Sequence, residues 1–489
     1  MNKKIRNIVL ISIVLISTVM HFKHFSKDLM SIHVWRQTQT QSTIDNFYEE
    51  DMNIFNPRRN DRGDSDGIFR MEFPIMQWLV AVQYKVFGHH LIITRVFMFL
   101  IGFLTVLGIY KLLNALFQNT ILSAIGAWAF NFSPSFYYYT INPLPDNFAL
   151  CSSVWGLALF FVWYNKKKSI YLVFCSMLLS IGALSKLPFI IYYIVPIVFF
   201  ADLLIKHGLK RNYFAQASVA ISFSIFPITW YLMVIPHWHG NVIVKGMLDN
   251  NESLLRLLDY YQHNLISTLP ELLVGYGSLV FFLAGFFFLF KNKVYEKNEF
   301  VLLFPLSILA ILYYLFEANA IAKIHDYYLF PFYPILFILV AYGAYNLHNS
   351  EIKFGRYITH TLLLVTPITC YLRMQARWNP DSPGFNKDLL VHKAELQNAV
   401  PKNALVVAGN DDSHFIMFYY IGKKGWGFSE DKLSPENLQD MIEKGAKYLY
   451  SDSKNIYENA ELMQYFDKMI LEKGSIKIYS LKKPTPNGQ

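Results

Sequence analysis

Carboxylates and cations stand at the ends of apolar segments, where their side chains could carry acid–base chemistry and bind an anion. Asp146 follows two prolines and opens a long apolar run, and Glu72 lies just before another proline in Arg70-Met-Glu-Phe-Pro. Lys186 and His325 occupy similar boundaries further along the chain. A carboxylate at the mouth of a membrane helix costs free energy unless it faces a polar cavity or a partner. Glu72 and Asp146 are therefore candidate general bases, and Lys186 and His325 are candidate ligands of an anion.

These residues also have structural interpretations. They are a helix cap for Asp146, an ion pair with Arg70 or Lys85 for Glu72, an interfacial position for Lys186, and an aromatic belt for His325, Tyr327 and Tyr328.

A second polar stretch lies near the amino terminus, in the sequence His33-Val-Trp-Arg-Gln-Thr-Gln-Thr. Its polar face has no apolar stripe to bury, which favours a polar ligand. The stretch and the loop after it supply further candidates of two kinds. The catalytic candidates are His33 and Asp45, and the binding candidates are Trp35, Arg36, Gln37, Arg58, Arg59 and Arg70, beside Tyr327 and Tyr328.

The composition predicts a membrane protein. Of the 489 residues, 54% are hydrophobic and only 16% are charged, whereas soluble domains carry about 25% charged residues. This excludes a soluble enzyme and a disordered chain. The net charge of +9 favours anionic lipid headgroups or phosphates as partners, and no basic helix or finger motif points to nucleic acid.

Apolar runs of about 20 residues predict about eleven membrane spans. They lie near 6–21, 94–115, 120–140, 147–164, 169–185, 188–205, 213–235, 271–290, 299–316, 327–346 and 355–372. The first run has no small-residue cleavage site after it, so we expect a retained anchor rather than a secretion signal. The apolar part of segment 73–87 is short and is interrupted by Gln77, Gln83 and Lys85, which favours an amphipathic helix at the membrane surface.

The basic residues of the short loops predict which parts lie outside. If segment 73–87 stays on the membrane surface, most of these basic residues, including Lys166-Lys167-Lys168, fall on the same side of the membrane as the amino terminus. The positive-inside rule places that side in the cytoplasm. The loops 22–93 and 236–270 and the region 373–489 then lie outside the cytoplasm. We expect a helical membrane domain over 1–372, with interfacial helices in its first outer loop. A small mixed α/β domain over 373–489 should hold strands near Ala404 and Ala446 and a capped helix after Ser434.

The order of these motifs resembles the bacterial membrane glycosyltransferases of the GT-C fold, related to protein O-mannosyltransferases and the aminoarabinose transferase of lipid A. The resemblance rests on the motif Glu72-Phe73-Pro74, on Arg95 and Asp146, and on the element His325-x-Tyr-Tyr-x-x-Pro331. The family usually carries an Asp-Glu pair early in the first loop. Here the stretch after His33 has no carboxylate before Asp45, so the family's usual base cannot be transferred to this chain.

The resemblance implies an inverting transfer of a sugar from a polyprenyl-phosphate donor to a lipid, polysaccharide or protein acceptor. It places the reaction on the outer face of the bacterial cytoplasmic membrane. Glu72 or Asp146 would be the general base, and His33 and Asp45 are alternatives. Arginines, Lys186 and His325 would bind the phosphate. The resemblance also allows for a divalent cofactor, Mg²⁺ or Mn²⁺, although the missing Asp-Glu pair weakens that expectation.

Two other functions fit a basic polytopic protein. A transporter or flippase should show two related halves with broken helices, and we find no such symmetry in the sequence. A polysaccharide polymerase or ligase would use the same lipid carrier, but it usually depends on an arginine-rich outer loop later in the chain. Here the polar cluster lies in the first loop.

Overall fold

The computed structural model describes residues 2–208, 210–238, 245–249 and 252–483. The predicted outer loop 236–270 therefore lies partly outside the described residues. The chain forms two compact units. The first unit is made of Met1–Phe25, Met71–Met76 and Thr94–Gln375, and the second is made of Ser26–Arg70, Gln77–Ile93 and Ala376–Gln489.

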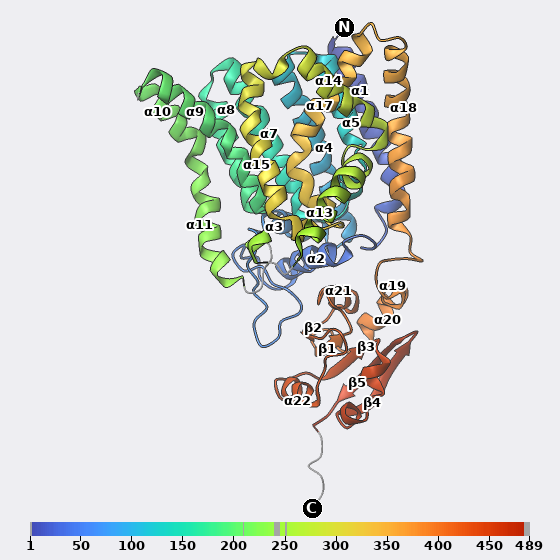
Figure 1. The fold of residues 1–489 in the computed structure, drawn as a ribbon. Helices are drawn as coiled ribbons and strands as arrows, with labels where there is room; N and C mark the ends of the chain where they lie inside the picture. The colour runs from blue at the N-terminus through green and yellow to red at the C-terminus, as the bar shows by residue number, and fades with distance from the viewer. Residues whose placement is uncertain (1, 209, 239–244, 250–251, 484–489) are drawn as a thin grey trace, which may run out of the picture. The chain divides into compact units, whose positions relative to one another are not determined.

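The first unit is helical, and its helices pack side by side (Figure 1). In chain order, its main helices are α1 (Asn2–His21), α4 (Leu91–Phe117), α5 (Thr120–Asn131), α6 (Pro134–Tyr139), α7 (Pro145–Lys166), α8 (Ser169–Ser185), α9 (Ile194–His207), α10 (Arg211–Ile221), α11 (Ile225–Val234), α13 (Leu254–His263), α14 (Tyr276–Lys291), α15 (Asn298–Phe316), α16 (Ala318–Ile321), α17 (Tyr333–Asn349) and α18 (Gly355–Met374). Shorter helical turns join them, notably η2 (Leu187–Tyr193) before α9, η6 (Asn264–Leu273) after α13 and η8 (Asp326–Phe332) before α17. The most extensive helix contacts are those of α7 with α8, and of α17 with α14 and α5.

The helices confirm a multi-span membrane protein. Within the described residues, six helices are long and apolar enough to cross a membrane. The number is seven if the pair Leu254–Leu273 and Tyr276–Lys291, bent by 114°, counts as one span. Shorter apolar helices fill other expected spans, at Thr120–Asn131, Ser169–Ser185 and Phe300–Phe316. The expected span 120–140 is broken because α5 ends at Asn131 and Pro134 starts the separate helix α6.

Segment 73–87 forms one short helix, α3 (Ile75–Phe87), of 13 residues. At about 1.5 Å of rise per residue, such a helix is shorter than the hydrocarbon core of about 30 Å. Its position at the membrane surface stays a prediction.

The second unit combines α2 (Val34–Glu49) and most of α3 with a small mixed sheet. Its strands are β1 (Leu405–Gly409), β2 (Lys424–Gly427), β3 (Tyr448–Ser451), β4 (Phe466–Lys473) and β5 (Ile476–Leu481), and its other helices are α19 (Lys387–Val391), α20 (Lys393–Asn398), α21 (Ile416–Ile421), α22 (Pro435–Glu443), α23 (Lys454–Tyr457) and α24 (Ala460–Met463).

The sheet has the order β2-β1-β3-β5-β4. Strand β1 pairs in parallel with β2 and β3, while β5 pairs antiparallel with β3 and β4. Val406 lies opposite both Gly425 and Tyr448. The Ser434 side chain accepts a hydrogen bond from the Asn437 amide and caps α22. The expected mixed α/β fold and its capped helix are confirmed, while the division into domains 1–372 and 373–489 stays a prediction.

Candidate active site

In the first unit, Lys186 lies between the two carboxylates that the sequence singles out. Its Nζ atom is 2.9 Å from Glu72 Oε1 and 3.7 Å from Asp146 Oδ1. All three side chains are buried, with exposed fractions of 4% for Lys186, 11% for Glu72 and 1% for Asp146. An ion pair at this depth is screened little by water, so its charges interact strongly.

Three separate segments place these side chains. Asp146 lies in the first turn of α7, which begins at Pro145, and the positive end of the helix dipole stabilises its carboxylate. Lys186 directly follows α8 and has an extended backbone, with φ −159° and ψ 116°. Glu72 lies in the segment 71–73, which we call the strap. The Phe73 amide of this strap donates to the Leu184 carbonyl at 2.9 Å.

The strap is held on its other side as well. Trp230 of α11 donates its indole N–H to the Met71 carbonyl at 2.9 Å, and its ring packs edge-on against Phe73, with centroids 4.8 Å apart. These contacts fix the backbone on both sides of Glu72. The carboxylate is therefore positioned before any substrate binds, as electrostatic catalysis requires.

The charges of this group do not cancel, because two carboxylates face one lysine. An aromatic ring adds to the stabilisation of the cation, since the Lys186 ammonium lies 4.8 Å from the centroid of the Tyr328 ring. The Glu72–Lys186–Asp146 group, which we call the carboxylate–lysine group, thus keeps one formal negative charge when both acids are ionised. Such a group can accept a proton or attract a further cation.

The predicted element around His325 lies beside the carboxylate–lysine group. The ring of His325 is 5.4 Å from that of Tyr328 and 5.8 Å from that of Tyr327, measured between centroids. Its Nδ1 atom is 2.6 Å from the Ala320 carbonyl oxygen, so this nitrogen is the donor. Burial lowers the pKa of His325. In the neutral imidazole, Nε2 is then unprotonated and can only accept a hydrogen bond, so His325 can donate to a phosphate oxygen only in its protonated form.

Sequence reasoning missed two acidic residues near this group. Asp326 is buried and accepts hydrogen bonds from Tyr139, at 2.7 Å, and from Ser135. Glu317 follows the last residue of α15 and is 6% exposed. Each lies at one boundary of an apolar helical segment, since Asp326 begins η8 and Glu317 follows α15. A carboxylate at such a boundary is the criterion that selected Asp146. Applied to every apolar run, it would have found them.

Glu317 is an acid that titrates near neutrality. Burial raises the pKa of Glu317 to about 7, against the opposing effect of the Lys186 charge. Among the described residues, its Oε2 atom has no hydrogen-bond partner. A carboxyl group with this pKa can exchange a proton at physiological pH.

The other predicted site residues belong to the second unit, and several of them lie at the start of α2. His33 precedes the helix in the left-handed conformation, with φ 55°. Arg36 donates to the Gln39 side chain at 2.5 Å, and Gln37 donates to the Ile32 carbonyl at 2.9 Å. Trp35 lines a cavity of about 350 Å³ next to the loop that contains Asp411. A ligand-binding role for these residues stays a prediction.

The remaining candidates form ion pairs and hydrogen bonds within the second unit. Asp45 Oδ1 lies 2.8 Å from His89 Nε2, and Arg58 Nη1 lies 3.1 Å from a Glu50 oxygen. The Arg59 guanidinium stands 4.8 Å from the centroid of the Phe69 ring. Arg70 donates to the Phe55 carbonyl at 2.7 Å and to the Asn56 side chain at 3.0 Å. These contacts hold the loop after α2 together.

The expected divalent cation finds no obvious donor set. Within the residues that the structure describes, no group of three or more His, Cys, Asp or Glu side chains is arranged to hold a metal ion. The carboxylates of Glu72 and Asp146 both face the ammonium group of Lys186 instead.

These features define the class of protein: an integral, multi-pass membrane protein. Residues 72–231, which include the whole carboxylate–lysine group, match the model of the family described as dolichyl-phosphate-mannose-protein mannosyltransferase. Comparison with curated proteins gave no match. The family match over 72–231 confirms the glycosyltransferase class that the motifs predict.

Three solved structures are similar to this chain over nearly its whole length. ArnT from Cupriavidus metallidurans, bound to undecaprenyl phosphate, has a TM-score of 0.65 and 12% identity, covering 96% of this chain and 97% of that one. The oligosaccharyltransferase AglB from Archaeoglobus fulgidus, in complex with an inhibitory peptide and a dolichol-phosphate, has a TM-score of 0.60 and 13% identity, covering 95% and 72%. The mycobacterial arabinofuranosyltransferase AftD has a TM-score of 0.58 and 11% identity, covering 98% and 40%. At these identities the likeness shows the fold.

Proposed function

We propose that the protein transfers a sugar from a polyprenyl-phosphate donor to a hydroxyl group of an acceptor, with inversion at the anomeric carbon. The observation that carries the proposal is the buried carboxylate–lysine group, in which Lys186 Nζ lies 2.9 Å from Glu72 and 3.7 Å from Asp146. The family match over 72–231 supports it, as do the lipid phosphates bound to ArnT and AglB.

The exposed fractions favour Glu72 as the base. Glu72 is 11% exposed and Asp146 is 1% exposed, so Glu72 is the carboxylate that an acceptor hydroxyl can reach more readily. It takes the hydroxyl proton while the acceptor oxygen forms a bond to the anomeric carbon. The bond from that carbon to the phosphate oxygen breaks, and the bonding electrons leave with the phosphate.

The charge of the site changes in step with this reaction. When Glu72 takes the proton, the carboxylate–lysine group loses its excess negative charge. The leaving phosphate gains one negative charge at the same time. Lys186 then keeps its contact with Asp146 and can turn its positive charge toward the phosphate, which stabilises the transition state. Asp146 acts as a positioning residue, because it keeps the ammonium group in place.

An apolar cavity in the same unit suits the chain of a lipid carrier. It has a volume of about 300 Å³ and is lined by Leu269, Ile311, Leu329 and Phe332, among others. Leu329 directly follows Tyr328, whose ring faces Lys186. Isoprenoid units are purely apolar and would leave water on entering such a cavity, which is favourable. The polar headgroup would then lie near the carboxylate–lysine group.

We further propose that the protein lies in the bacterial cytoplasmic membrane, with this site and residues 373–489 on the outer face. The positive-inside distribution supports this orientation. The acceptor is a lipid, a polysaccharide or a protein.

The activity is tested with purified protein in liposomes, given a polyprenyl-phosphate sugar and a cell-envelope extract from the same type of cell as acceptor. We expect labelled sugar to enter a single acceptor fraction and free polyprenyl phosphate to appear in equal amount. A flippase would move the lipid without cleaving it, and a polymerase would give products of many lengths. Either result would contradict the proposed transfer.

A further inference from the structure

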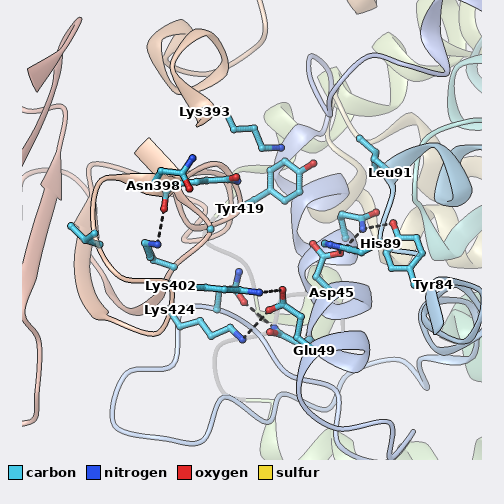
Figure 2. A pocket seen from close by; sticks show the side chains of 17 residues that line it. Asp45, Glu49, Tyr84, His89, Leu91, Lys393, Asn398, Lys402, Tyr419 and Lys424 are labelled. Atoms are coloured by element: carbon cyan, nitrogen blue, oxygen red, sulfur yellow. Dashed lines mark hydrogen bonds and ion pairs between the residues drawn. The ribbon is translucent and has the colours of Figure 1, made fainter. Parts of the chain in front are cut away.

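The second unit contains a polar cavity that the proposed chemistry does not use. Its volume is about 520 Å³, within the usual range of roughly 300–1,000 Å³ for small-molecule sites. One wall is formed by α2 with Asp45 and Glu49, together with Tyr84 and His89. The opposite wall is formed by the segment that carries Lys393 and by α21 (Figure 2). All of its lining residues belong to the second unit.

The uncharged part of the lining has the chemistry of a sugar site. Amide side chains gather there, namely Gln41, Asn46, Asn60, Gln397 and Asn398. Each carries both donors and an acceptor, which suits the neighbouring hydroxyl groups of a saccharide. Tyr84 and Tyr419 add aromatic rings that can pack against its C–H faces.

Cations outnumber anions around this cavity. Its lining includes Lys393, Lys402, Lys423 and Lys424, against Asp45 and Glu49. Most of these charges are paired. Lys402 binds Glu49 at 3.0 Å, Lys393 binds Asp28 at 2.6 Å, and Lys424 binds Glu50 (Figure 2 shows the first of these). Asp45 pairs with His89 at 2.8 Å.

Lys423 differs from the other three lysines. It is only 2% exposed, and its ammonium donates to the backbone carbonyl of Gln397 at 2.8 Å. Within the described ranges, no carboxylate forms an ion pair with it. Burial and the nearby charge of Lys402 lower the pKa of Lys423. A buried cation without a counter-charge is costly, and an anion entering the cavity would remove much of that cost.

We propose that this cavity binds an anionic sugar residue of the acceptor, and that Lys423 donates to its carboxylate or phosphate group. The amide side chains bind the hydroxyl groups of the same saccharide. The identification of this saccharide as the acceptor rests on the proposed function, whereas binding itself does not.

Binding is measured by calorimetry on the full-length protein in nanodiscs, without any donor lipid. The probes are a hyaluronan tetrasaccharide, which carries glucuronate, the neutral chitotetraose, and mannose 6-phosphate beside mannose. We expect at least one acidic probe to bind at least tenfold more tightly than its neutral counterpart. The hyaluronan arm identifies a carboxylate and the mannose 6-phosphate arm a phosphate. Equal binding of acidic and neutral probes, or no binding of any probe, would overturn the proposal.

Matched variants test the role of the lysines. Lys423→Gln should weaken binding of the acidic probe about tenfold, the size of one charge-assisted hydrogen bond. Lys402→Gln should weaken it severalfold without endangering the fold, because Lys402 is 75% exposed. Lys468→Gln, an exposed lysine of β4 outside the cavity, is the control and should bind like the unchanged protein. Unchanged affinity in both cavity variants would contradict the assignment.

A Glu72→Gln variant separates this proposal from the proposed function. It should lose transfer and keep full binding of the acidic probe. If transfer were absent from the unchanged protein while this binding remained, the proposed reaction would fail and the anionic sugar site would stand.

Discussion

Lys186 Nζ lies 2.9 Å from Glu72 Oε1, although 114 residues separate the two in the chain. The contact joins the strap around Met71 to the end of α8, and both side chains are largely buried. A buried ion pair of this kind contributes little net stability compared with apolar residues, but the loss of one partner is costly. Its presence therefore favours a role in chemistry over a role in folding.

The first prediction concerns the stability that depends on Lys186. Lys186→Met should lower the free energy of unfolding by about 3–5 kcal/mol, because it removes the ammonium group that pairs with the buried carboxylates of Glu72 and Asp146. Lys206→Met is the matched control, since that lysine pairs with Asp202 on the surface, with exposed fractions of 64% and 50%. It should change stability by less than about 0.5 kcal/mol. Thermal unfolding in detergent measures both, and equal effects would contradict the buried ion pair.

The second prediction concerns the pH dependence that Glu317 imposes. Burial raises its pKa from 4.5 to about 7, so the folded protein holds this proton where the unfolded chain has released it. The associated stability is fully present below the unfolded pKa and is lost as the pH rises through about 7. Glu317→Gln should therefore be more stable than the unchanged protein at pH 8 and about equally stable at pH 4.5. A difference that is the same at both pH values would show that Glu317 does not titrate in this range.

The third prediction concerns the ion pair between Asp45 and His89. The hydrogen bond to Asp45 raises the pKa of His89 above 6.5. The stability that the ion pair contributes to the fold is therefore present below pH 6.5 and is lost as the pH rises through the higher folded pKa. Because the His89 side chain is 42% exposed, the effect should stay below about 1 kcal/mol. Asp45→Asn should lower the pKa of His89 as followed by NMR of labelled histidine, with His89→Gln identifying the signal. An unmoved titration would refute the pairing.

The fourth prediction concerns the apolar cavity of the first unit. Leu269→Trp should fill part of it, and the KM for a donor with a long polyprenyl chain should rise about tenfold. The KM for a donor in which a methyl group replaces the isoprenoid chain should change little, because that donor has no chain to occupy the cavity. Leu283→Trp, at a position of α14 that is 60% exposed and outside the lining, should leave both values unchanged. Equal effects on long and short donors would place the lipid elsewhere.

Much of the fold could be predicted because membrane spans are long and uniformly apolar. The helices α4 and α7 coincide with two such runs, and β1 and α22 lie where a buried strand and a capped helix were expected. The breaks in other spans were harder to foresee. The run 120–140 is mostly apolar, but Pro134 has no N–H to continue the helical hydrogen bonding, so two helices replace the single expected span.

The candidate site was predictable residue by residue but not as a set of contacts. Asp146 and Lys186 stand out because each interrupts an apolar context at a helix end. Nothing local indicates that Lys186 would pair with Glu72, since Arg70 and Lys85 lie closer to Glu72 in sequence. Such pairing depends on the tertiary contacts that hold Met71 and Phe73 against Leu184 and Trp230. The raised pKa of Glu317 likewise comes from burial, which the sequence around it does not reveal.

The most direct test of the account compares sugar transfer by Glu72→Gln and Asp146→Asn, in liposomes, with a polyprenyl-phosphate sugar as donor. Glu72→Gln should reduce kcat by about 10²–10⁴-fold, the usual contribution of a general base, and should abolish the acidic limb of the pH–rate profile. Asp146→Asn should reduce kcat less and keep that limb, because it only loosens the position of Lys186. Undiminished transfer by both variants would show that the buried carboxylates facing Lys186 do not carry the reaction.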